Sequence, residues 1–135
     1  MRQIAGGCLC GLVRYEAAAE PIMTGLCHCD DCQRQSGAAF GVMVAIPRPA
    51  LKLQGSLRVY EGQGASGYPT YRHFCPNCSS SIFSETTIMP DIAMIWCGTL
   101  DDRSWVTPTV ELWCERAQPW TRDAAETQKF SRMPG

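Results

Sequence analysis

The sequence lacks clusters of basic residues and long apolar segments. Lysine and arginine number 12 against 13 acidic residues, the formal net charge is −1, and the basic residues form no run. Because a protein that binds nucleic acid neutralises phosphates with clustered cations, we expect no nucleic-acid partner. No apolar stretch approaches the ~20 residues that cross a bilayer, and residues 1–7 lack the apolar core of a secretory signal. These absences predict no membrane partner and a cytoplasmic location.

The chain also lacks internal repeats, low-complexity tracts and linker-like segments. The glycine-rich residues 62–67 contain no lysine of a phosphate-binding loop, so this segment gives no indication of a nucleotide. With 135 residues and a hydrophobic content of 45%, the sequence suits one domain with a real apolar core. We therefore predict a single domain over 1–135, with its core at about 5–120 and a C-terminal tail at 121–135.

Cysteine is abundant, with nine residues in the chain. A complete set of disulfides would leave one thiol over, and a reducing cytoplasm disfavours disulfides, so we expect metal ligands. The densest group is a C-x-C-x-x-C pattern made by Cys27, Cys29 and Cys32. Alternation along an extended segment points Cys27 and Cys29 the same way and His28 the other way. Three protein ligands with a vacant fourth position are typical of a catalytic zinc.

Four further cysteines form a second set of two pairs: Cys8, Cys10, Cys75 and Cys78. Four thiolates suit a closed, structural zinc site. Because the two pairs are far apart in the sequence, a shared ion would tie the start of the chain to a distant segment. The cysteines therefore predict two zinc ions, one structural and one catalytic. Cys97 and Cys114 lie inside apolar runs, and we expect both to be small core residues.

Hydrophobic alternation and turn residues predict a mostly β chain with little helix. Strands are expected at residues 12–17, 23–27, 38–46, 51–54, 57–61, 71–74, 81–85, 92–100 and 110–114. A short helix is expected over 31–35, capped by Asp30 and closed by Gly37. The cysteine pair at 75–78 then forms the tip of a hairpin. One helical turn is expected between Asp123 and Phe130.

Four segments carry a resemblance to a known family: Gly7–Gly11, Cys27–Gln33, Phe74–Cys78 and Gly98–Asp101. In order and spacing they resemble the glutathione-dependent formaldehyde-activating enzyme family, which also contains centromere protein V. The resemblance runs from about residue 5 to residue 120. It implies a β-tent fold, as in the Mss4-like zinc proteins. It also implies carbon–sulfur lyase activity, in which glutathione and formaldehyde condense to S-hydroxymethylglutathione.

By this resemblance, the structural zinc ligands are Cys8, Cys10, Cys75 and Cys78, and the catalytic ones are Cys27, Cys29 and Cys32. Two positions depart from the family pattern. Ser79 stands where glycine is common, and since a left-handed conformation costs a non-glycine residue about 1 kcal/mol, we expect the local turn to differ. Glu111 stands where many members have histidine, which we expect to affect the substrate side of the site.

The expected partners are a small-molecule thiol, such as glutathione, and an aldehyde. The open position on the catalytic zinc would hold the thiol as a thiolate beside the carbonyl. Acid, base and substrate-anchoring roles stay open among the polar residues near the motifs: His28, Asp30, Asp31, Arg34, Arg48, Tyr68, Tyr71, Arg72 and His73. The main alternative is a non-catalytic zinc module that binds a partner and has two closed sites. A redox pair made by Cys75 and Cys78 explains the cysteines less well, because it leaves Cys8 and Cys10 without a role. An iron–sulfur cluster would also use four cysteines, and its colour would distinguish it from a colourless zinc protein.

Overall fold

The computed structural model describes residues 1–134, and the side chains of residues 122–125 lie outside the description. The strands of the described chain are β1 (Gln3–Gly7), β2 (Arg14–Ala18), β3 (Met23–Cys27), β4 (Gly41–Pro47), β5 (Leu51–Gln54), β6 (Arg58–Gln63), β7 (Pro69–Phe74), β8 (Ser81–Thr86), β9 (Met89–Trp96) and β10 (Val110–Leu112). The helices are α1 (Asp30–Ser36) and the 3₁₀ segments η1 (Arg48–Ala50), η2 (Cys97–Thr99), η3 (Cys114–Arg116) and η4 (Pro119–Glu126).

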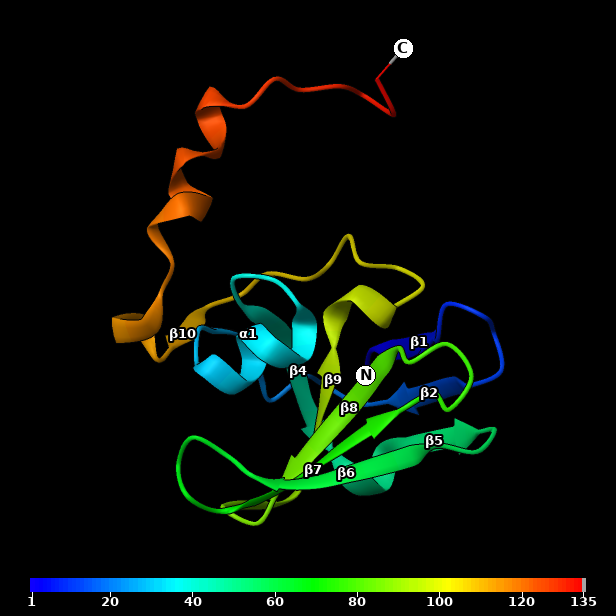
Figure 1. The fold of residues 1–135 in the computed structure, drawn as a ribbon. Helices are drawn as coiled ribbons and strands as arrows, with labels where there is room; N and C mark the ends of the chain where they lie inside the picture. The colour runs from blue at the N-terminus through cyan, green and yellow to red at the C-terminus, as the bar shows by residue number, and fades with distance from the viewer. Residues whose placement is uncertain (135) are drawn as a thin grey trace.

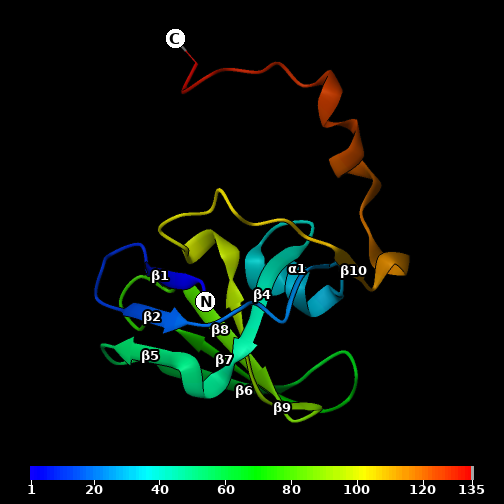
Figure 2. The ribbon, with the colours of Figure 1, turned by 180° about the vertical axis from the view of Figure 1, so that it is seen from behind.

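The strands form two sheets. A three-stranded sheet has the order β1-β2-β5, and a seven-stranded sheet has the order β10-β3-β4-β9-β8-β7-β6. Neighbouring strands are antiparallel except β10 and β3, which run parallel with Val110 opposite Gly25. Figures 1 and 2 show the chain after β10 extending away from both sheets. No helix in the described range is long and apolar enough to cross a bilayer.

The main core gathers residues from both sheets. Val13 and Tyr15 come from the β2 region, and Val44, Phe83 and Ile95 come from the large sheet. Strand alternation puts these three residues of the large sheet on one face, because Val44 and Phe83 both lie opposite Ile95 in register. Burying each large apolar side chain contributes about 1.5–3 kcal/mol. The other face of the large sheet is therefore left to form the site.

The expectation of a mostly β chain with little helix is confirmed. β1 was not among the expected strands, because its two glycines weaken a strand pattern. The strand expected over 38–46 begins only at Gly41, and the one expected over 92–100 ends at Trp96, where η2 begins. The hairpin that carries the second cysteine pair is present as β7 and β8. In the tail, the helical segment lies at η4, a few residues earlier than expected.

Two corrections concern residues around the cysteine motifs. The helix α1 begins one residue early, because Cys29 rather than Asp30 is its N-cap, whereas Gly37 closes it as expected with φ of 70°. Cys97 is buried, as predicted, but the prediction that Cys114 is a core residue is wrong, since it is exposed. β10 ends at Leu112 and Trp113 turns the chain in a left-handed conformation, so the apolar run does not continue as a strand.

Candidate metal centres

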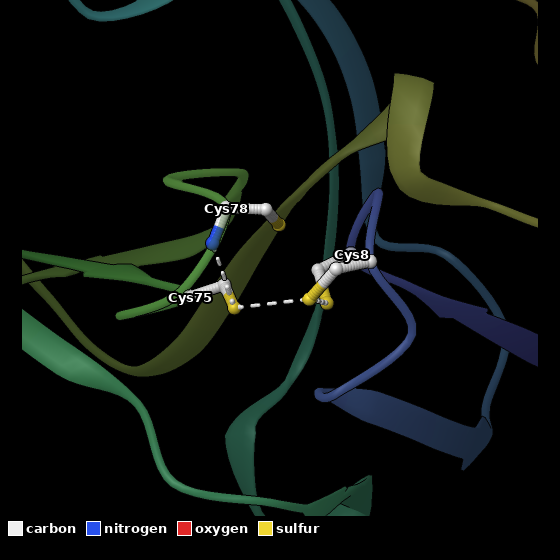
Figure 3. Close-up of side chains that lie close together, drawn as sticks. Cys8, Cys75 and Cys78 are labelled. Atoms are coloured by element: carbon white, nitrogen blue, oxygen red, sulfur yellow. Dashed lines mark hydrogen bonds between the residues drawn. The ribbon is translucent and has the colours of Figure 1, made fainter.

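The four-cysteine cluster joins two segments that are distant in the sequence. Cys8 and Cys10 follow β1, and Cys75 and Cys78 lie in the turn between β7 and β8. All four sulfur atoms lie within 4.8 Å of one another. Figure 3 shows Cys8 on one segment facing Cys75 and Cys78 on the other.

The sulfur separations in this cluster suit a tetrahedral ion. The Cys8 and Cys10 Sγ atoms are 3.6 Å apart, and those of Cys10 and Cys75 are 3.9 Å apart. A tetrahedral zinc with ~2.3 Å bonds to sulfur requires sulfurs ~3.8 Å apart. Hydrogen bonds from the Ser80 side chain and backbone lower the pKa of Cys78 to about 5, which favours the thiolate that a metal needs. The donor set therefore fits zinc.

Backbone donors surround the same sulfurs. The Val13 N–H donates to Cys8 Sγ at 3.2 Å, and the Asn77 N–H donates to Cys75 Sγ at 3.4 Å. Such bonds stabilise negative charge on sulfur. Ser79, directly after the second pair, has φ of 69°. The expectation that the turn would avoid this left-handed conformation is wrong, and its cost is offset by the contacts of the turn, which include the Ser79 N–H bond to the Cys75 carbonyl at 3.0 Å.

The three-cysteine cluster lies where β3 meets α1. Cys27 ends β3, Cys29 caps α1 and Cys32 lies in the first turn of the helix. All three are buried, with exposed fractions of 7%, 5% and 5%, and their sulfurs lie within 4.8 Å of one another. Trp96 and Met43 pack against them and form an apolar cluster separate from the main core.

The three thiols compete for negative charge. Hydrogen bonds with Cys27 and Cys32 hold the pKa of Cys29 far below its usual value, while Cys29 raises the pKa of Cys27. Cys27 and Cys29 together raise the pKa of Cys32. Three thiolates at this separation repel one another, and a divalent cation removes that repulsion. The cluster is thus suited to a thiophilic metal ion.

His28 does not join this cluster. Its Nε2 lies 3.1 Å from Glu111 Oε1, and its Nδ1 is buried without a hydrogen-bond partner among the described residues. Glu111 lies opposite Leu26 in the β10–β3 register, while its neighbour Leu112 lies opposite Cys27. The side chain of Glu111 therefore contacts His28 on the face of β3 away from the three thiols. It does not reach the side of the cleft, where its effect on a substrate was expected.

A cleft opens beside the three-cysteine cluster, with a volume of ≈ 150 Å³. Its apolar lining comes from Met43, Ile88, Met89, Met94, Leu112 and Trp113. Its polar lining includes Thr70, Arg72, Ser84 and Thr86 on β7 and β8, and Ser84 lies opposite Met94 in the β8–β9 register. The three thiols thus border a cleft whose lining is partly apolar and partly polar.

The chain is similar to known proteins in sequence and in fold. The sequence profile of the family described as glutathione-dependent formaldehyde-activating enzyme matches residues 3–116. The chain belongs to that family. A Halomonas elongata protein, whose name marks it as a candidate glutathione-dependent formaldehyde-activating enzyme, is 23% identical over 132 residues. The match covers 93% of this chain and 83% of that protein.

A crystal structure of a Rhodobacter sphaeroides protein shares the fold, with a TM-score of 0.61 and 20% sequence identity. The superposed region covers 80% of this chain and 98% of the Rhodobacter sphaeroides chain. The match of the family profile confirms the resemblance predicted from the cysteine spacing, and the crystal structure agrees with the fold alone. The β-tent name, the domain boundaries and the zinc-ligand roles stay predictions.

The other candidate residues fall into different places. Asp30 and Asp31 lie in the first turn of α1, where acidic groups suit the helix dipole. His73 stacks on Phe83 with ring centroids 4.0 Å apart, and its Nε2 lies 3.1 Å from Glu85, off the hydrogen-bonding direction. Arg48 pairs with the same glutamate.

Three of the candidates lie near the cleft or its mouth. Tyr68 and Arg72 line the cleft, while Arg34 borders an adjacent hollow that Arg72 also lines. The methionines that line the cleft and Ser84 were not among the residues predicted from the sequence. The signal for Ser84 was faint: a hydroxyl in the apolar run Ile82–Phe83–Ser84.

Proposed function

We propose that this chain is a zinc-dependent carbon–sulfur lyase. It adds a thiol, glutathione or a similar one, to an aldehyde such as formaldehyde to give an S-hydroxymethyl adduct, and it also catalyses the reverse reaction. The observation that carries the proposal is the convergence of Cys27, Cys29 and Cys32 on the cleft. Family membership supports it. The cytoplasm is the proposed location, because nine reduced thiols persist there.

The two clusters are proposed to divide the work. Cys8, Cys10, Cys75 and Cys78 hold a structural zinc, because four sulfurs complete a tetrahedron and leave no position for substrate. Cys27, Cys29 and Cys32 would hold the catalytic zinc with three protein ligands, the number typical of a zinc that also binds substrate, and all three line the cleft. Zinc bound there supplies a site at which an incoming thiol loses its proton and is kept as a thiolate.

The residues of the chain prepare this position. The Cys32 N–H donates to Cys29 Sγ at 3.2 Å and fixes that sulfur at the start of α1. Trp96 and Met43 pack against the thiols, and Met43 also lines the cleft. In the cleft, the thiolate sulfur forms a bond with the aldehyde carbon while the carbonyl π bond breaks. The proton released by the thiol reaches the carbonyl oxygen through solvent, so the step is balanced without an oxidant or reductant.

The test combines metal analysis with an exchange assay. Thiol–formaldehyde adducts form spontaneously, so the rate of exchange between free and adduct forms is measured by NMR with labelled formaldehyde, across several thiols. We expect two zinc ions per chain and exchange faster than the uncatalysed rate. Cys29→Ser should keep the fold, since serine is a good N-cap, but lose one zinc and the acceleration. Cys114→Ser, at an exposed thiol outside both clusters, is the matched control.

The competing function is a non-catalytic zinc module. It predicts two zinc ions in a protein that leaves exchange at the uncatalysed rate for every thiol tried. Full acceleration in a Cys29→Ser protein that has lost one zinc would also refute the lyase proposal.

A further inference from the structure

Arg72 is a cationic residue that lines the cleft. Arg72 is half-buried, and its guanidinium makes no hydrogen bond or ion pair with another residue of the described chain. By contrast, Arg14 pairs with Asp101 and Arg48 pairs with Glu85. A partly desolvated cation without a partner is unfavourable, so an unpaired arginine beside a cleft points to an anionic ligand.

Ser84 provides a second and independent observation. It lies directly opposite Arg72 in the β7–β8 register, so the two side chains are neighbours on the same face of the sheet. Ser84 lines the cleft, is 2% exposed, and its Oγ has no hydrogen-bond partner in the described residues. Buried hydroxyls normally have a partner, and one that lacks it within the protein is suited to a ligand.

We propose that Arg72 and Ser84 form a carboxylate-binding subsite of the cleft. The guanidinium binds the two oxygens of a carboxylate and the Ser84 hydroxyl donates to one of them. The ligand class is therefore an acid whose thiol or aldehyde group reaches the three-cysteine cluster and whose carbon chain contacts the methionines that also line the cleft. This inference deepens the proposed function and rests on it, because it takes the cleft to be the substrate site.

The carboxylate has two possible sources, and two pairs of probes separate them. In the thiol arm, the dissociation constant of 3-mercaptopropionate is compared with that of its amide. In the aldehyde arm, glyoxylate is compared with its amide. Binding is measured by calorimetry on the zinc-saturated protein, so it does not depend on turnover. Since charge-assisted hydrogen bonds are strong, we expect the acid to bind about 10- to 100-fold more tightly in at least one arm.

Three variants test the assignment. Arg72→Met keeps a side chain of similar length without charge and should abolish the preference for the acid. Arg58→Met is the matched control, because it makes the same charge change at an exposed position outside the cleft. Ser84→Ala should reduce the preference while raising the melting temperature, because it removes a buried hydroxyl that lacks a partner. A serine with only a structural role would lower the melting temperature.

Equal binding of acid and amide in both arms overturns the subsite, and so does an Arg72→Met protein that keeps the preference. If the Arg72→Met protein keeps the preference for the acid and also binds zinc more weakly in a chelator titration, Arg72 only balances the charge of the thiolates. The lyase proposal fails separately, if the wild-type protein leaves thiol–formaldehyde exchange at the uncatalysed rate. In that case the ratio of the dissociation constants of acid and amide still decides whether the subsite exists.

Discussion

Replacing Cys10 by serine tests whether one metal ion holds the scaffold together. Cys10 is exposed, so its thiol contributes little to packing, and an ordinary surface substitution changes stability by no more than about 0.5 kcal/mol. Its sulfur nevertheless lies 3.9 Å from that of Cys75, which is 65 positions away in the sequence. A large loss of stability in Cys10→Ser would therefore come from the metal site and not from the core.

The magnitude follows from the loop that the ion closes. The entropic cost of closing a loop grows as (3/2)RT ln n, and for this separation it is about 4 kcal/mol. A bound ion offsets this cost in the folded state, and the offset is lost with the ion. Because small domains are stable by only about 5–15 kcal/mol, the loss would be a large part of the total.

The assay is urea unfolding followed by tryptophan fluorescence, with zinc content measured on the same samples. We expect Cys10→Ser to lose about 4 kcal/mol of unfolding free energy and one zinc per chain. Cys29→Ser should lose the other zinc at a smaller cost in stability. Cys114→Ser, a second exposed thiol, should resemble the wild type in both measurements.

The reasoning is refuted if Cys10→Ser is as stable as Cys114→Ser and keeps two zinc ions. It is also refuted if Cys29→Ser is the less stable of the two ligand variants, because the three-cysteine cluster would then hold the scaffold.

Three further predictions concern packing and charge. A Cβ at position 41 would lie 2.6 Å from the indole ring of Trp96, which packs on the three thiols. Gly41→Ala should therefore weaken zinc binding at the three-cysteine cluster in a chelator titration and spare the four-cysteine site; unchanged binding at both sites would contradict this. Burial raises the pKa of Cys97 to about 11, so at pH 9 iodoacetamide should modify Cys114 and leave Cys97 protonated and unmodified, as mass spectrometry would show. Asp101→Asn removes the carboxylate that pairs with Arg14, and the resulting drop in melting temperature should shrink in about 1 M salt; a drop that is independent of salt would point to a different cause.

The cysteine clusters could be predicted from the sequence because their geometry is mostly local. Cys27 and Cys29 share a face by strand alternation, and Cys32 returns within the first helical turn. The same alternation correctly predicted that the His28 side chain points away from the three thiols. The four-cysteine cluster needed one further step, the assumption that two pairs of thiols with complementary spacing share an ion, and its sulfurs do converge.

The walls of the cleft were not predictable, because they depend on which strands pair and in what register. Arg72, Ser84 and Met94 lie in one row across β7, β8 and β9, yet they are distant from the three thiols in sequence. The period of two in β7 shows that Arg72 and His73 face opposite ways, but not which of them faces the core. Cys114 was misplaced for a similar reason, since an apolar run does not show where its strand ends.

The parallel pairing of β10 with β3 explains how a departure from the family pattern is accommodated. Glu111 and Leu112 are adjacent, so they point to opposite faces of this short strand. Leu112 lines the cleft, whereas Glu111 contacts His28 across 83 positions of sequence. The Glu111–His28 contact therefore joins β10 to the end of β3 on the side away from the cleft. Because Glu111 is not among the residues that line the cleft, we expect a substitution at position 111 to act on the cleft through its neighbour Leu112.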